Sequence, residues 1–102
     1  MNERYTFRFK AKVWLYRSAG HGTWYFVTVP QELSDEIDGV AIGLKGGWGS
    51  VRVNVTVGQT NWKTSVFPDK SEMAYILPLK ASVRKKEGIE EGSTIDLILE
   101  IE

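Results

Sequence analysis

The sequence predicts a mainly β domain, a small closed or double-split β-barrel of six or seven strands with two short helices. Apolar and polar residues alternate with a period of two along several stretches, which is typical of strands with one buried face. Glycine or proline interrupts these stretches at short intervals. The 102 residues can form one hydrophobic core without disulfides, so we expect a single domain over residues 1–102.

The N-terminal part predicts a hairpin. Residues 5–17 alternate between apolar side chains and basic or aromatic ones, which favours one long strand. Residues 18–22 form a glycine-rich turn that holds the single histidine, His21, and residues 23–29 resume a strand pattern. We expect Trp24 in this second strand to belong to the core, because aromatic side chains dominate small cores.

A short helix follows the first hairpin. Pro30 suits the first turn of a helix, and acidic residues lie near that end, where the helix dipole favours negative charge. Gly39 is expected to end the helix. Residues 40–44 are apolar and predict either a connection or a short strand, which leads into the glycine-rich residues 46–49.

The central hairpin, residues 50–67, has the clearest pattern in the chain. Valines at every second position alternate with polar residues, and Gly58 suits the first central position of a type II′ turn. With a two-residue turn, the valine face also carries Trp62 and is predicted to be core. The predicted partners are Val57 with Thr60, Val55 with Trp62, Val53 with Thr64, Val51 with Val66, Asn54 with Lys63, and Arg52 with Ser65.

The C-terminal third predicts a strand, a helix and a final strand. Residues 67–71 are expected to form a turn or loop, and residues 73–77 a short strand. Residues 79–87 have a helical pattern, and Gly88 followed by an apolar residue fits a C-terminal cap. Residues 94–102 then alternate as a strand.

Several segments together are similar to those of a known family. They are GGWGSVRVNVTVG, WKTSVFPD, YILPLKASVRKKEGI and EEGSTIDLIL, with FRFKAKVWLY and TWYFVTVP near the N-terminus. The chain resembles a bacterial family catalogued as a domain of unknown function, number nineteen-oh-five. The resemblance implies a double-split β-barrel, the fold class shared with AbrB-like transition-state regulators, and no established activity. Those regulators bind DNA as dimers, and for this chain we expect a monomer or a homodimer.

Composition excludes several classes of function. The absence of cysteine excludes disulfides, thiol catalysis and thiolate metal sites. Thirteen basic residues balance thirteen acidic ones, which argues against a nucleic-acid footprint over the whole domain. No apolar run is long enough to span a bilayer, and the N-terminus lacks the apolar core of a signal peptide. We therefore expect a cytoplasmic protein with no membrane partner.

The first candidate site is the polar face of the central hairpin. It combines cationic donors with an aromatic side chain at its entrance, which suits an anionic or sugar-like small ligand or a nucleobase. A solvated sheet face would also carry such residues. We predict a non-catalytic binding or interaction module, for a small ligand or a protein partner, with this tentative site: Trp48, Arg52, Asn54, Lys63 and Ser65.

The alternative is an AbrB-like nucleic-acid-binding regulator that uses the basic helix at residues 80–86. Its basic side chains could follow a phosphate backbone, although they would also suit a solvated helix face. The residues concerned are Lys80, Arg84, Lys85 and Lys86, with Arg8, Lys10 and Lys12 as further contributors.

An enzyme is the third interpretation. A nucleophilic site would have to combine His21 with Ser50 or Ser65, and nothing in their spacing supports that arrangement. One histidine and scattered carboxylates show no metal-ligand spacing, and the glycines match no phosphate-binding motif. We therefore predict no catalytic residues, no metal site and no cofactor.

Overall fold

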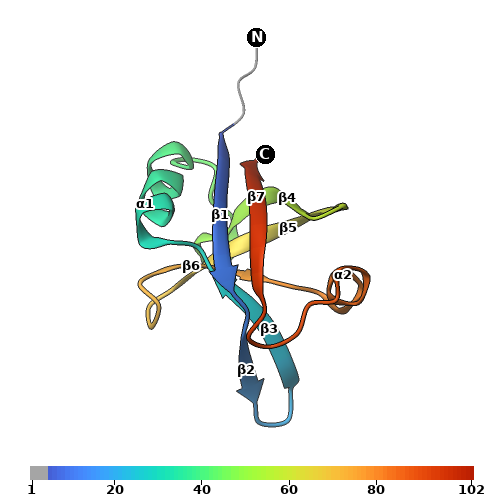
Figure 1. The fold of residues 1–102 in the computed structure, drawn as a ribbon. Helices are drawn as coiled ribbons and strands as arrows, with labels where there is room; N and C mark the ends of the chain where they lie inside the picture. The colour runs from blue at the N-terminus through green and yellow to red at the C-terminus, as the bar shows by residue number, and fades with distance from the viewer. Residues whose placement is uncertain (1–4) are drawn as a thin grey trace.

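The computed structural model describes residues 5–102, so the first four residues of the predicted single domain lie outside the described residues. Within 5–102, seven strands form one sheet in the order β1-β7-β4-β5-β6-β3-β2, curled into a half-barrel with two α-helices (Figure 1). The mainly β prediction is confirmed at this level. The elements are β1 (Thr6–Lys12), β2 (Trp14–Ser18), β3 (Gly22–Thr28), α1 (Gln31–Val40), the 3₁₀ turn η1 (Gly47–Gly49), β4 (Val51–Val57), β5 (Thr60–Asp69), β6 (Ala74–Pro78), α2 (Ala81–Glu87) and β7 (Thr94–Ile101).

The concave face of the sheet holds the core. Every second residue of β4 and β7 is buried there, as the alternation predicts. Ile37 of α1 and Val83 of α2 are buried in the same core, so each helix contributes its apolar side. No helix in the described part of the chain has the length and apolar character needed to cross a membrane.

The predicted register of the central hairpin is confirmed at all six positions. Val55 lies opposite Trp62, Asn54 lies opposite Lys63, and the other four pairs follow in step. Of the two turn residues, only Gly58 has a positive φ, 57°, which fits the type II′ turn. Trp62 is 7% exposed, so its predicted place in the core is also confirmed.

The predicted single strand over residues 5–17 is wrong, because the chain changes partners at Val13. β1 pairs with β7 as far as Lys12, and β2 pairs with β3 from Trp14 onwards. Between them the Val13 N–H donates to the Ser93 carbonyl, and the Val13 carbonyl accepts from the Gly92 N–H. The alternation of faces continues through the break, which is why the sequence pattern does not reveal it.

The predicted turn over residues 67–71 is also wrong in its first half. β5 pairs with β4 up to Val66 and with β6 from Phe67 to Asp69. Pro68 is tolerated in this strand because the pairing of β5 with β4 stops at Val66. The missing N–H of Pro68 therefore interrupts no hydrogen bonds on the β4 side. One strand therefore belongs to both halves of the sheet.

The helices largely follow the prediction. α1 continues one residue beyond Gly39, and residues 41–44 form turns and not a strand. α2 begins two residues later than expected. It ends at the predicted cap, where Gly88 has a φ of 64° and the Ile89 N–H donates to the Arg84 carbonyl at 2.9 Å.

Candidate functional site

The structure divides the predicted hairpin site between different surfaces. On the outer face of β4 and β5, the Arg52 Nη1 lies 3.5 Å from the Ser65 Oγ, and Asn54 lies opposite Lys63. Trp48 is not on this face. It belongs to η1, where its φ is 64° and its side chain is 91% exposed.

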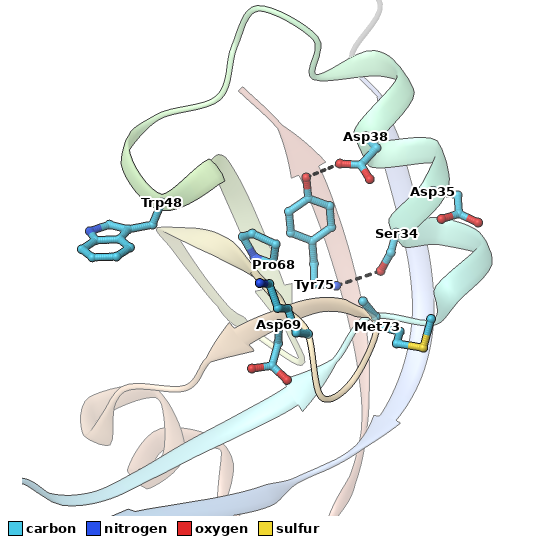
Figure 2. A pocket seen from close by; sticks show the side chains of 10 residues that line it. Ser34, Asp35, Asp38, Trp48, Pro68, Asp69, Met73 and Tyr75 are labelled. Atoms are coloured by element: carbon cyan, nitrogen blue, oxygen red, sulfur yellow. Dashed lines mark hydrogen bonds between the residues drawn. The ribbon is translucent and has the colours of Figure 1, made fainter.

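Trp48 lines a first cavity of about 390 Å³ beside α1, called here the α1 cavity. Figure 2 shows its ring pointing away from Tyr75, which lies deep in the same cavity. Asp35 and Asp38 of α1 also line it, with Asp69, Lys70 and Met73 opposite. Met73 also has a positive φ, 52°.

Several polar groups of the α1 cavity bond to one another and to Lys45 beside it. The Tyr75 hydroxyl donates to the Asp38 Oδ1 at 2.5 Å (Figure 2). The Lys45 Nζ, from the loop after α1, donates to the same oxygen at 2.8 Å. Ser34, which is 4% exposed, accepts the Tyr75 N–H at 3.0 Å and donates to the Val29 carbonyl at 3.1 Å. These bonds connect α1 to β6 and to the end of β3.

The pKa shifts in the α1 cavity have the causes expected for such a network. The hydrogen bond from Lys45, then that from Tyr75, lowers the pKa of Asp38. Burial raises the pKa of Tyr75, and the hydrogen bond to Asp38 raises it further. The hydrogen bond to Asp38 raises the pKa of Lys45. The carboxylate, the ammonium and the neutral phenol therefore stabilise one another at neutral pH.

A second cavity of about 480 Å³, called here the α2 cavity, lies where the two halves of the sheet separate. Residues 60–66 of β5 pair with β4 alone, because β5 meets β6 only from Phe67 onwards. β3 likewise meets β6 only over Phe26–Thr28. The first halves of β3 and β5 are therefore not bridged by a strand, and α2 packs beside this gap.

The α2 cavity has an apolar base and a basic rim. Trp62 and Leu79 are buried, 7% and 3% exposed, and line the cavity with Tyr25. Lys63 and Lys80 are exposed residues of the lining. No aspartate or glutamate among the described residues lines this cavity.

Arg84 is held in a fixed position on this rim. Its guanidinium carbon lies 3.7 Å from the centroid of the Tyr25 ring, and its Nε donates to the Leu79 carbonyl at 3.0 Å. Within residues 5–102, neither Nη atom of Arg84 has a hydrogen-bond partner. Both Nη groups of the guanidinium therefore remain available to donate to a ligand, in an orientation already set by the protein.

The α2 cavity unites residues that the sequence assigned to two separate sites. Lys63 came from the polar face of the hairpin, whereas Lys80 and Arg84 came from the basic helix. Lys85 and Lys86 of the same helix are exposed outside the cavity. Across the described chain, no carboxylate forms an ion pair with any of the three cations in the lining.

Sequence reasoning missed the contribution of the aromatic residues. Trp24 was predicted to be core, but it is 50% exposed, because it lies on the outer face of the β2–β3 hairpin where no further layer covers it. Tyr25, its neighbour on the opposite face, supports Arg84. The alternation of Trp24 and Tyr25 identifies two faces, but it does not show which one is covered.

The residues considered for catalysis are placed apart from one another. His21 is exposed in the β2–β3 turn and lines the α2 cavity, whereas neither Ser50 nor Ser65 lines that cavity. The described residues contain no group of three or more His, Cys, Asp or Glu side chains that could hold a metal ion.

Two comparisons with known proteins bear on this chain. A family model described as Domain of unknown function (DUF1905) matches residues 9–99. The matched range covers all of the residues that line the two cavities. No curated protein matches the sequence.

Proposed function

The chain belongs to the family described as Domain of unknown function (DUF1905), and from the geometry of the α2 cavity we propose that it is a non-catalytic module that binds an anionic small ligand. One observation carries this proposal. Three cations, Lys63, Lys80 and Arg84, line one cavity, and no carboxylate of the described chain neutralises them.

The physical argument is electrostatic. Like charges around one cavity repel one another, and this repulsion costs stability unless an anion binds between them. Arg84 adds fixed geometry, because its stacking on Tyr25 reduces the entropy that it loses when it contacts a phosphate or carboxylate. The apolar base formed by Trp62 and Leu79 favours a ligand with an apolar or planar part beside its charge. A neutral sugar would leave the three cations without partners.

We also propose that the curled sheet is the double-split barrel that the family resemblance implies. The division of β5 between β4 and β6 supports this, as does the contact between β1 and β3 across the open side of the sheet. The AbrB-like alternative would place duplex DNA along α2. It therefore requires Lys85 and Lys86, outside the cavity, as much as Lys80 and Arg84.

Titration of the ¹⁵N-labelled protein with inorganic pyrophosphate tests the anion site. We expect saturable amide shifts around Lys80 and Arg84, and each of Lys80→Met and Arg84→Met should weaken binding about tenfold. Lys85→Met is the matched control, since it removes the same charge from the same helix outside the cavity. Arg52→Ala separates the cavity from the outer face of the hairpin and should change nothing.

Two results would overturn the proposal. If Lys85→Met weakens pyrophosphate binding as much as Lys80→Met does, the binding is general electrostatic attraction and not a site. If the protein binds duplex DNA with an affinity that falls steeply with salt and depends on Lys85 and Lys86, the nucleic-acid alternative is favoured.

A further inference from the structure

The outer face of the β2–β3 hairpin carries a group of four aromatic side chains, called here the aromatic face: Trp14, Tyr16, Trp24 and Phe26. Trp14 lies opposite Phe26, and Tyr16 lies opposite Trp24, so the four form two adjacent cross-strand pairs. The hairpin projects from one end of the molecule, beyond β1 and β7 (Figure 1). The aromatic face adjoins the α2 cavity, because Trp24 also lines that cavity, whereas the other three aromatic residues do not.

The rings of the aromatic face have defined positions but are not covered. The Trp14 and Phe26 centroids lie 5.1 Å apart, and the Trp24 and Phe26 rings are nearly parallel at 6.4 Å. The Trp14 Nε1 donates to the Thr28 Oγ1 at 2.9 Å, which fixes the indole. Tyr16 and Trp24 remain 54% and 50% exposed. Two aromatic surfaces, Tyr16 and Trp24, are therefore available to planar groups from solvent, and the Trp24 ring is held by its stacking on Phe26.

Positive charge lies on the same face. Because the alternation continues through Val13, the outward residues of β1 precede Trp14 and Tyr16 in the same row. Arg8 is paired with Asp96 at 3.2 Å. Lys10 and Lys12 are exposed and have no carboxylate partner within residues 5–102. At a strand rise of about 3.3 Å per residue, the α-carbons of Lys12 and Tyr16 are roughly 13 Å apart.

We propose that the aromatic face and the adjacent lysines bind single-stranded nucleic acid. Bases stack on Tyr16 and Trp24, and Lys10 and Lys12 contact the phosphates. Stacking on exposed aromatic side chains beside a basic strip is how proteins hold single strands without reading their sequence. A duplex is a poorer fit, because its bases already stack on each other. A neutral sugar could stack on the rings but would not use the lysines.

Fluorescence anisotropy with dye-labelled oligo(dT) and oligo(U) of ten nucleotides tests this inference. We expect both to bind, and an abasic strand of the same length and charge to bind at least tenfold more weakly. Trp24→Ala should weaken oligo(dT) binding about tenfold, whereas Trp24→Phe should retain most of it. Trp48→Ala is the matched control, because it removes an exposed tryptophan from the α1 cavity and should have no effect.

The salt dependence tests the lysines independently. Each phosphate contact to a single strand contributes about 0.7 to the slope of log K against log salt. Lys12→Met should therefore lower that slope by about 0.7, and Lys85→Met should leave it unchanged. Lys80→Met separates this inference from the proposed anion site, because it should weaken pyrophosphate binding and leave oligo(dT) affinity intact.

Two outcomes would overturn the inference. If the abasic strand binds as tightly as oligo(dT), the rings do not stack on bases and the interaction is only electrostatic. If no single strand binds, and sedimentation velocity shows a dimer that Trp24→Ala dissociates, the aromatic face is a self-association surface. Amide spectra of each variant establish that it remains folded in these measurements.

Discussion

The two cavities differ in how their polar groups are satisfied. In the α1 cavity, the Tyr75 hydroxyl, the Asp38 carboxylate and the Ser34 hydroxyl all bond within the protein. In the α2 cavity, Lys80 and Lys63 have no partner of opposite charge in the described chain. These hydrogen bonds make the α1 cavity part of the fold, although the exposed Asp35 and Lys70 of its lining form no ion pair in the described chain. A cavity that holds unpaired like charges loses stability on its own and gains it from an anion.

If the α1 cavity is structural, Ser34→Ala should have the largest effect on stability. The substitution leaves the buried Tyr75 N–H and the Val29 carbonyl without their hydrogen-bond partner. Each of these two unsatisfied backbone groups costs about 1–3 kcal/mol, so the free energy of unfolding should fall by about 2–6 kcal/mol. Urea unfolding measures it, with the exposed Ser82→Ala as control. A loss below about 0.5 kcal/mol would remove the structural interpretation of this cavity.

The second prediction concerns pH and Asp38. Its pKa is lowered in the folded state, so the carboxylate stabilises the fold above its unfolded pKa of about 3.9, and this contribution is lost as the pH falls through the folded value. Asp38→Asn should therefore unfold at lower urea than the wild type at pH 7, and the difference should shrink below about pH 4. Because Asp38 is half-exposed, the effect should be smaller than that of Ser34→Ala.

The pKa shift of Tyr75 has the opposite sign to that of Asp38, so its effect on stability appears at high pH. Its pKa is raised, so its contribution is present below about pH 10 and is lost only as the pH rises through the higher folded value. Between these limits the stability contributed by the network should not change with pH.

Asp35→Asn is the matched control for Asp38→Asn, since Asp35 lies on the same helix and lines the same cavity. A difference between wild type and Asp38→Asn that stays constant from pH 7 to pH 3 would contradict the assignment.

The sequence predicted the hairpin register because every required signal is local. Four valines at alternate positions fix the buried face, Gly58 permits the turn, and a slip of one residue would expose Trp62. The partner change at Val13 leaves no such signal, since both β1 and β2 keep the same alternation. Pro68 wrongly indicated a turn. The sequence pattern does not reveal that β5 has left its pairing with β4 at this point and pairs only with β6.

The α2 cavity could not be predicted for a related reason. It exists because β5 begins to pair with β6 only at Phe67, and this depends on contacts between distant parts of the chain. The sequence does identify Lys63 and Lys80 as cations of two patterned segments. Only the fold places them around one cavity, with Tyr25 under Arg84. The sequence therefore identifies which residues are cations, but it does not show that they surround the same cavity.

The smallest expected effect is a change in melting temperature that tests whether the cations of the α2 cavity repel one another. Without a ligand, Lys80→Met should raise the melting temperature by about 1–2 °C at low salt, because it relieves repulsion from Lys63 and Arg84. Salt should shrink this gain by screening. Excess pyrophosphate should stabilise the wild type more than the variant and so reverse the order. Lys85→Met, outside the cavity, should not show this reversal. If Lys80→Met destabilises the protein without ligand, Lys80 serves the fold, and the two cavities do not differ in the way proposed.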